Sequence, residues 1–380
     1  MNNLLYSLFF FVFFVFSACS QSTEITEAKP EISPIENDTV RLFFVGDAMG
    51  HHPMISKAWD SKLKSYNYES WFKFIKPHLN KYDYCLVNLE VTLAGYPYKG
   101  YPRFSSPDNF AKALKKTGFD LFCTSNNHSF DRGGSGLERT IKTLENISVD
   151  HVGTYQNKTI RDSIYPFITE VKGHKFAFLN YTYGTEVAVT KPYIVNFIDT
   201  NQIKTDIKNA IDKGASCIIS IIHWGEEYEI FENDFQKSHA QWLADHGVDA
   251  IVGMHPHVVQ PMKVIYSDHF KSKKIPVAFS LGNFVSRHSR KQNIGIGIEM
   301  SFIFNNKKPK WDDWAYTPIW TQEMFSPRGH FPLFGKLIDD ICSNKNTELK
   351  LDSNQKSELI NFNNKTRNHL KGISEINWIK

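Results

Sequence analysis

Two hydrophobic periodicities alternate along the chain from Arg41 to about Phe304. Short apolar runs of strand length occur at residues 42–45, 84–87, 121–124, 176–179, 217–222, 250–252 and 277–281. Runs of this length, rich in β-branched and aromatic residues, predict buried strands. Between several of them the apolar residues recur at helical spacing. Strands that alternate with helices predict an α/β domain with a largely parallel or mixed sheet.

Four of the predicted helices carry start or stop signals, namely polar residues before the apolar stripe and a glycine after it. The expected starts are Asp108, the capping-box pair Ser135 and Glu138, Thr200 and Asp234, and the expected stops are Gly118, Gly214 and Gly247. Beyond residue 305 the periodicity weakens, and one helix is expected near 353–363. We therefore interpret residues 40–304 as the main domain and 305–380 as a C-terminal extension.

The N-terminus has the pattern of an export signal. Leu4 to Phe16 form an almost unbroken apolar run, which is short for a membrane span but suits a signal-peptide core. The run ends in Phe16-Ser17-Ala18-Cys19, which resembles a lipobox, so residues 1–19 are expected to be a lipoprotein-type signal peptide with Cys19 acylated. A plain secretory signal with a chance cysteine is the alternative. Residues 20–39 are expected to form a flexible tether, which predicts an envelope lipoprotein facing outside the cytoplasm.

Composition excludes some classes of function. The chain has 380 residues, 41% hydrophobic content and a formal charge of +4, and it has no basic cluster interleaved with aromatic residues, so we expect no nucleic-acid partner. The cysteines after Cys19 show no C-x-x-C spacing, which argues against a zinc–thiolate site.

Polar residues follow six of the predicted strands directly. They are Asp47, Asn88 to Glu90, Asn126 to His128, His223, His255 to His257, and Asn283. Sites in α/β proteins assemble outside the carboxyl ends of strands, so these side chains can converge without being close in sequence.

The residue types in these clusters suit a hard or borderline divalent cation such as Mn, Fe, Zn or Mg, because they offer imidazole, carboxylate and amide oxygen but no thiolate. His255 and His257 are two residues apart, so an extended backbone would project both imidazoles to one side. Pro256 between them disfavours a helix and is expected to keep His255 extended.

Six ordered motifs within residues 41–286 resemble the bacterial CapA family of capsule, or poly-γ-glutamate, synthesis proteins. The motifs are Gly46-Asp47-x-Met49, Asn88-Leu89-Glu90, Asn126-Asn127-His128-x-x-Asp131-x-Gly133, His223-Trp224-Gly225-x-Glu227-Tyr228, His255-Pro256-His257-Val258-x-Gln260 and Ser280-Leu281-Gly282-Asn283-Phe284. That family is related to the calcineurin-like metallophosphatases, so the resemblance implies a four-layer α/β/β/α sandwich with mixed sheets.

The resemblance also implies roles for single residues. The implied metal ligands are Asp47, Glu90, Asn127, His223, His255 and His257. His128 is implied as the general acid that protonates a leaving group. One departure stands out: Met49 occupies a position where the phosphatases have a ligand histidine, and His51 or His52 is a possible substitute.

Five further residues are candidates for contact with an anionic substrate, namely Arg103, Asn126, Glu227, Gln260 and Asn283. Structural roles compete with this interpretation. Asn126 and the nearby Asp131 have the residue types that fix loops through side-chain to backbone hydrogen bonds. Glu227 lies in an acidic stretch that can also be a solvated face.

The sequence thus predicts an exported, membrane-anchored protein of capsule or poly-γ-glutamate biosynthesis. It favours a metal-dependent hydrolase or transferase acting on an anionic polymer or a phosphoester. The alternative is a non-catalytic component that binds the polymer or other capsule-synthesis proteins.

Overall fold

The computed structural model describes residues 38–270, 273–287, 294–305, 308–325, 328–343, 345, 349 and 351–376. All of them belong to one compact unit, Asn37–Lys380. The expected signal peptide with Cys19, and the expected tether up to residue 37, lie outside the described residues. Within the described part, none of the helices is long and apolar enough to span a membrane.

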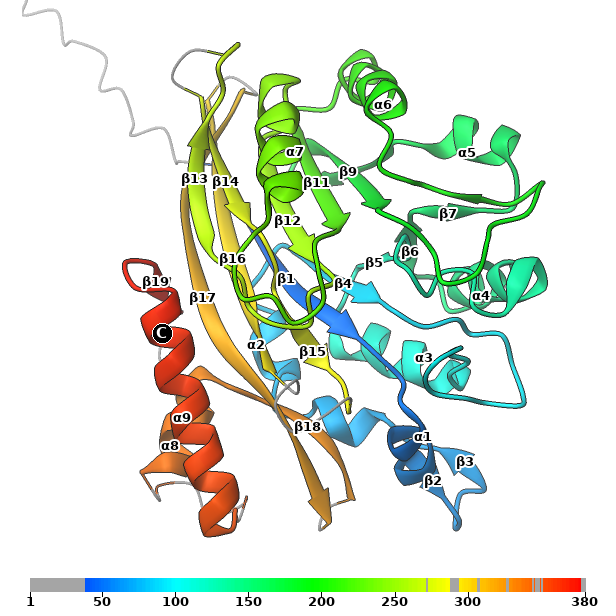
Figure 1. The fold of residues 1–380 in the computed structure, drawn as a ribbon, viewed down its shortest axis with the longest axis vertical. Coiled ribbons are helices and arrows are strands. Elements are labelled where there is room, and N and C mark those ends of the chain that lie inside the picture. The colour runs from blue at the N-terminus through cyan, green and yellow to red at the C-terminus, as the bar shows by residue number, and fades with distance from the viewer. Residues whose placement is uncertain are drawn as a thin grey trace, which may run out of the picture. The chain divides into compact units, whose positions relative to one another are not determined.

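Figure 1 shows the order of the elements in the described part. The strands are β1 (Asp38–Ala48), β2 (Trp59–Asp60), β3 (Ser65–Tyr66), β4 (Tyr84–Leu89), β5 (Leu121–Cys123), β6 (Asp150–Val152), β7 (Thr154–Tyr155), β8 (Phe167–Val171), β9 (His174–Thr182), β10 (Ile194–Val195), β11 (Cys217–His223), β12 (Ala250–Met254), β13 (Met262–Tyr266), β14 (Lys274–Ala278), β15 (Asn283–Val285), β16 (Ile294–Asn305), β17 (Lys308–Phe325), β18 (Arg328–Phe334) and β19 (Ser374–Glu375). The helices are α1 (His52–Ala58), η1 (Glu69–Phe72), α2 (Lys76–Leu79), α3 (Asp108–Thr117), α4 (Gly133–Asn146), α5 (Lys158–Ile164), α6 (Thr200–Asp212), α7 (Asp234–Asp245), α8 (Gly335–Cys342) and α9 (Ser353–His369).

Two large mixed sheets form the frame. The first has the order β18-β17-β16-β1-β4-β5-β6, with β15 beside β1 and β19 beside β17. Its strands β1, β4, β5 and β6 are parallel, whereas β16 runs antiparallel to β1. The second has the order β13-β14-β12-β11-β9-β8, with four parallel central strands and an antiparallel strand at each edge. The predicted α/β class with mixed sheets is confirmed.

The two sheets pack face to face. Tyr84 of β4 stacks on Phe178 of β9 with ring centroids 5.5 Å apart, and Phe302 of β16 meets Phe176 of β9 at 6.0 Å. Successive residues of a strand point to opposite faces of the sheet. Accordingly Phe43 of β1 belongs to a second apolar cluster on the outer face of the first sheet.

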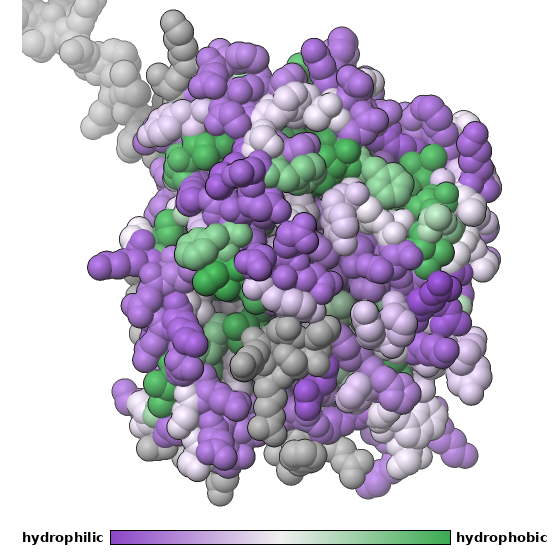
Figure 2. Space-filling view, in the orientation of Figure 1, coloured by the Kyte–Doolittle hydropathy of each residue, from purple (hydrophilic) through white to green (hydrophobic). Residues whose placement is uncertain are grey.

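Helices cover both outer faces, which gives the sandwich four layers. Phe110 and Leu114 of α3 pack in the cluster that contains Phe43, whereas Ile207 of α6 and Leu243 of α7 pack in the cluster that contains the second sheet. Hydrophilic residues dominate the face seen in Figure 2, where hydrophobic residues appear in separate small patches. Most large apolar side chains of the described residues are buried in the packing between layers.

The helix ends agree only in part with the predictions. Gly118 ends α3 with a φ of 120°, as expected. The predicted capping box at Ser135 and Glu138 is wrong, because α4 already begins at Gly133 and has no side-chain cap. In α7 the capping box uses Asn233 and Gln236, one residue before the expected start. Local cap motifs therefore locate these helices to within one or two residues.

Two strand predictions also change. The apolar run at 277–281 is not one strand, since β14 ends at Ala278 and β15 begins at Asn283. Phe279 leaves the ladder, and its carbonyl accepts a hydrogen bond from Trp224 Nε1 at 3.0 Å. Beyond the expected domain boundary at 304/305, β17 and β18 extend the first sheet. The expected helix near 353–363 is present as α9.

A bulge at Gly46 shapes the end of β1. Val45 pairs with Val87 of β4, but the next pair is Asp47 with Asn88, so Gly46 is an extra residue on β1. The Asp47 amide donates to the Gly282 carbonyl at 3.0 Å, and a Cβ on Gly46 would lie 1.8 Å from that oxygen. Bulges re-aim side chains at strand ends, and here the bulge positions Asp47.

We expect Gly46→Ala to lower the free energy of unfolding by about 1–3 kcal/mol, because the added methyl group overlaps the Gly282 backbone. Urea unfolding of the full chain, followed by circular dichroism, measures the change. Gly184→Ala is the matched control, since a Cβ there meets no atom within 4 Å, and its expected effect is below about 0.5 kcal/mol. Equal effects in the two variants would contradict the role given to the bulge.

Candidate metal centre

The six predicted ligands meet where the carboxyl ends of the two sheets come together. Asp47 lies at the end of β1 and Glu90 directly after β4, both in the first sheet. His223 is the last residue of β11 and His255 directly follows β12, both in the second sheet. Because parallel strands present their carboxyl ends at one edge, two facing sheets bring four separate segments to one point.

Short distances connect the side chains. His257 Nδ1 lies 3.3 Å from Asp47 Oδ2, and His257 Nε2 lies 3.7 Å from Glu90 Oε1. His223 Nε2 is 3.7 Å from the same Glu90 oxygen and 3.0 Å from Asn127 Oδ1. The rings of His223 and His255 are 4.8 Å apart. These side chains are all buried.

Two groups of residues in the described part of the chain have the geometry to hold a cation. One consists of Asp47, Glu90 and His223, and the other of Glu227, His255 and His257, with the ligand atoms of each group within 4.8 Å of one another. Glu227 is the exposed member. It was predicted as a substrate contact, and the structure instead places its carboxylate beside two imidazoles.

Two buried polar atoms of this cluster have no hydrogen-bond partner in the described structure, Glu90 Oε1 and His255 Nδ1. Buried polar atoms are normally hydrogen-bonded, because an unpaired one has lost its contact with water without replacement. A divalent cation bound by these two atoms would provide the partner that each of them lacks. The donor set therefore fits a cation of the hard or borderline class.

The electrostatics agree with this fit. Burial and the neighbouring Asp47 carboxylate raise the pKa of Glu90 well above its usual value. Burial and the other imidazoles lower the pKa of His223, and burial and His257 lower the pKa of His255 to about 3. Burial alone would lower the pKa of His257, but its hydrogen bond to Asp47 gives a net increase. His223 and His255 are thus neutral near pH 7, as metal ligands must be.

The backbone at the two paired histidines corrects the predicted extended conformation. His255 has a φ of 99° and His257 a φ of 56°, both in the left-handed region that side-chain-bearing residues rarely adopt. Tertiary hydrogen bonds hold this turn: the His255 amide donates to Asp47 Oδ2 at 3.3 Å, and His257 Nδ1 lies 3.0 Å from Asn283 Oδ1. Contacts between the sheets therefore override the local preference set by Pro256.

Three buried asparagines brace the cluster. Asn88 Nδ2 donates to Asp47 Oδ1 at 2.8 Å. Asn126 Nδ2 donates to Asn88 Oδ1 and its Oδ1 accepts from the His128 amide. Asn283 orients His257 as described above. Asn126 and Asn283 were predicted as substrate contacts, and their side chains are instead engaged with protein groups.

The structure adds Glu186, which the sequence did not indicate. Its carboxylate accepts a hydrogen bond from Asn127 Nδ2 at 3.1 Å, and its amide donates to the Asn127 carbonyl at 2.8 Å. The bond fixes the amide group so that Oδ1 faces His223. Glu186 lies in the loop after β9, outside the six motifs, so no sequence signal pointed to it.

His128 is held in one orientation. Its Nδ1 lies 2.9 Å from Asp131 Oδ2, and that same oxygen accepts a hydrogen bond from the Phe104 amide at 2.7 Å. The Phe104 ring contacts the imidazole edge-on, with centroids 4.6 Å apart. Nδ1 is therefore committed to Asp131, and Nε2 is the atom left for a substrate.

Met49 and the two histidines that follow it, His51 and His52, have different surroundings. It packs in the apolar cluster on the outer face of the first sheet. His51 Nδ1 accepts a hydrogen bond from the Arg287 amide at 3.2 Å, and His52 is exposed at the start of α1. Neither belongs to the two ligand groups found among the described residues.

The last two predicted substrate contacts, Arg103 and Gln260, differ in their surroundings. Arg103 is exposed on the loop between β4 and α3. Gln260 is buried and donates to the carbonyls of Glu229 and Phe231 at 2.9 and 3.1 Å. Gln260 thus holds the loop after β11, which carries Glu227.

Fold and site together define a two-sheet α/β protein with a candidate divalent-cation centre at the meeting of the sheets. Residues 41–288 match the family described as bacterial capsule synthesis protein PGA_cap. The chain belongs to this family, and the resemblance to CapA proteins is confirmed.

Two curated relatives carry the CapA name. The capsule biosynthesis protein CapA of Bacillus anthracis is 29% identical over 271 residues, which cover 68% of this chain and 63% of the relative. The PGA biosynthesis protein CapA of Bacillus subtilis (strain 168) is 28% identical over 264 residues, 67% of this chain and 66% of the relative. The alignments span slightly less than two thirds of both relatives.

Solved structures of phosphoesterase type are also similar. The calcineurin-like phosphoesterase YfkN from Bacillus subtilis has a TM-score of 0.42 and 12% identity, covering 86% of this chain and 97% of that one. The 5′-nucleotidase from Candida albicans SC5314 has a TM-score of 0.43 and 12% identity, covering 88% and 59%.

We expect Glu186→Ala to weaken the binding of Mn²⁺ about tenfold, because groups that orient a ligand typically contribute at least that factor to metal affinity. Calorimetric titration of the metal-free protein measures the affinity. Glu186→Gln is the matched control, since its amide oxygen can still accept from Asn127, and its affinity should stay close to that of the wild type. An unchanged affinity in Glu186→Ala would show that Asn127 needs no such support.

Proposed function

We propose that the protein is a metal-dependent hydrolase or transferase that acts on an anionic substrate in capsule or poly-γ-glutamate biosynthesis. The observation that carries this proposal is the buried cluster of carboxylates and imidazoles with unpaired ligand atoms beside the oriented His128. A structural cation would not require a proton-transfer residue at its edge. Membership of the capsule synthesis family supports the biological setting.

The residues divide the chemistry between them. Asp47, Glu90 and His223 would hold one cation, and a cation at this site would act as a Lewis acid on the substrate. Asp131 fixes His128 through Nδ1, so that Nε2 can give its proton to a leaving-group oxygen or nitrogen. Asn127, the residue before His128, has its Oδ1 3.0 Å from His223 Nε2, which supports a position of the imidazole at the edge of the ligand cluster.

We expect His128→Ala to lower kcat by roughly 10²- to 10⁴-fold, the usual contribution of general acid–base catalysis, while the protein keeps its metal. His257→Ala should lower both metal content and activity. Turnover of phosphoesters and of poly-γ-glutamate by the full chain with Mn²⁺, together with metal analysis, measures both effects. His239→Ala, on α7 and outside the cluster, serves as the control.

Full activity in both His128→Ala and His257→Ala, or no metal in the wild-type protein, would overturn the catalytic proposal. Metal content alone is not sufficient, because a non-catalytic polymer-binding component would also bind a structural cation. Turnover and metal content are therefore measured on the same preparations.

We also propose that the chain is anchored to the outside of the bacterial membrane through an acylated Cys19. The apolar run Leu4 to Phe16 followed by small residues and a cysteine supports this arrangement. An anchored enzyme would meet its polymer at the envelope.

For this anchor, Cys19→Ser should abolish incorporation of labelled fatty acid and shift the protein from the membrane fraction to the soluble fraction. Metabolic labelling followed by cell fractionation measures both. Cys342→Ser, which changes a partly exposed cysteine of the folded part, is the control. Labelling that persists in Cys19→Ser would contradict acylation at this residue.

A further inference from the structure

A strip of aromatic side chains crosses the surface beyond the ends of β1 and β4. Trp59, Tyr66, Tyr98 and Tyr96 form this strip, with successive ring centroids 5.1, 5.2 and 6.0 Å apart. Trp59 is 46% exposed and Tyr96 is 86% exposed. Large aromatic residues left in water at a continuous patch mark interaction surfaces.

Unpaired basic residues flank the aromatic strip on three separate elements. Lys62 lies in the β2–β3 turn, Lys99 in the loop after β4, and Lys112 on α3, and all three are exposed. Their side chains form no hydrogen bond or ion pair with any residue that the structure describes. Arg103 is exposed on the same loop as Lys99. This surface therefore offers free positive charge beside apolar rings.

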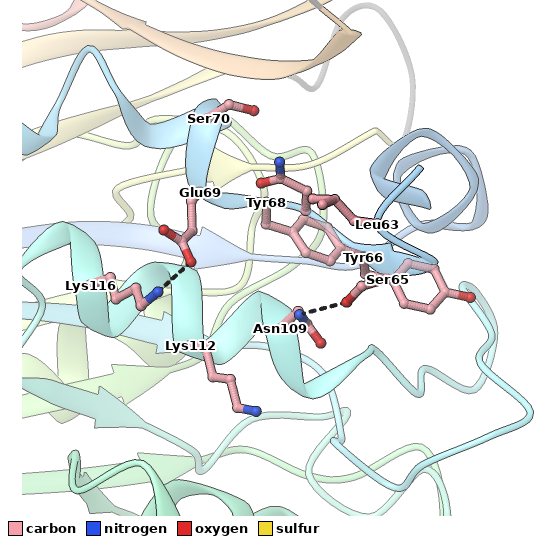
Figure 3. Close-up of a pocket in the computed structure, with 10 residues that line it drawn as sticks. Leu63, Ser65, Tyr66, Tyr68, Glu69, Ser70, Asn109, Lys112 and Lys116 are labelled. Carbon is pink, nitrogen blue, oxygen red and sulfur yellow. Dashed lines mark hydrogen bonds and ion pairs between the residues drawn. The ribbon is translucent and has the colours of Figure 1, made fainter. Parts of the chain in front are cut away.

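A pocket of about 490 Å³ joins the strip to α3 (Figure 3). Tyr66 belongs to both the strip and the pocket, and Lys112 and Lys116 of α3 are among the residues that line the pocket. Lys116 is paired with Glu69 at 2.5 Å. Lys112 is thus the lysine of this pocket whose ammonium group is available to a ligand.

The strip connects directly to the candidate proton donor. Lys99 and Ser105 exchange backbone hydrogen bonds of 3.0 and 2.8 Å, which close a loop of residues 100–104 that begins directly after Tyr98 and Lys99. The residue before Ser105 is Phe104, whose ring contacts His128 and whose amide bonds to Asp131. One short loop therefore connects the aromatic strip with His128, the candidate proton donor.

The distribution of charge favours the approach of a polyanion from the side of the aromatic strip over an approach from the loops of the second sheet. The loops that follow β9 and β11 of the second sheet carry the exposed acidic residues Glu186, Glu226 and Glu229, besides the candidate ligand Glu227. A polyanion would be repelled there and attracted to the lysines beside the strip, which follows the first sheet.

The angles between neighbouring rings favour one class of ligand. Neighbouring rings of the strip meet edge to face, at interplanar angles of 65°, 84° and 88°. Their faces are not coplanar, so they do not form the flat platform on which successive sugar rings would stack. Edges and faces in alternation suit a narrow chain of methylene and amide groups.

We propose that the aromatic strip and its lysines bind a carboxylated polyamide chain of the poly-γ-glutamate type and lead it to the metal centre. This inference rests on the proposed function, and it adds the route by which the polymer reaches the site. The aromatic rings contact the methylene groups, and the ammonium groups pair with the carboxylates.

The test is the binding of fluorescently labelled poly-γ-glutamate to the full-length protein, followed by anisotropy at low ionic strength. The triple variant Lys62→Gln, Lys99→Gln and Lys112→Gln should raise Kd about tenfold, because three exposed ion pairs are lost. The effect should shrink as salt screens the charges. The double variant Trp59→Ala and Tyr96→Ala should raise Kd roughly fivefold at both salt levels.

The matched control replaces three exposed lysines elsewhere on the protein, Lys142→Gln, Lys204→Gln and Lys310→Gln. It should change Kd less than about twofold, because net charge alone has little effect on binding. The triple and double surface variants should keep the metal content of the wild type, which separates a loss of polymer binding from a loss of the metal centre. An unchanged Kd in both surface variants, an equal loss in the control, or tighter binding of a carboxylated polysaccharide would overturn the inference.

Discussion

Burial of two carboxylates and three imidazoles at the meeting of two sheets is the constraint on which the rest of the structure depends. Asp47 and Glu90 are removed from water, and such groups are costly unless they are paired or bind a metal. The bulge at Gly46, the strained turn at His255 and His257, and the bracing asparagines all serve to orient this cluster. At these positions the contacts of the cluster override the local backbone preferences.

The sequence predicted the cluster better than its surroundings. Short apolar runs locate the strand ends. The polar residues that follow these runs are Asp47, Glu90, His223 and the turn at His255. The backbone of that turn was not predictable, because hydrogen bonds from the other sheet determine it. Glu186 was missed for a similar reason, since its contact with the site is tertiary and no motif surrounds it.

The sequence also failed to predict how far the first sheet extends. Strands β17 and β18 alternate poorly in hydrophobicity, and the chain from 308 to 334 is rich in aromatic and charged residues. The pairing of β17 with β16, and of β18 with β17, supplies the order that the local pattern lacks. Such long antiparallel strands depend on a neighbour that is already in place.

The two-sheet origin of the ligands has a consequence for folding. A cation held by Glu90 of one sheet and His223 of the other would act as a cross-link between layers that are otherwise joined by side-chain packing and hydrogen bonds such as that from the His255 amide to Asp47. All four described cysteines are free thiols, so no disulfide among them shares this task. Ligand binding to the native state alone stabilises it by about 2.7 kcal/mol at a hundredfold excess over Kd. The supply of metal would thus govern the stability of the packing between the two sheets.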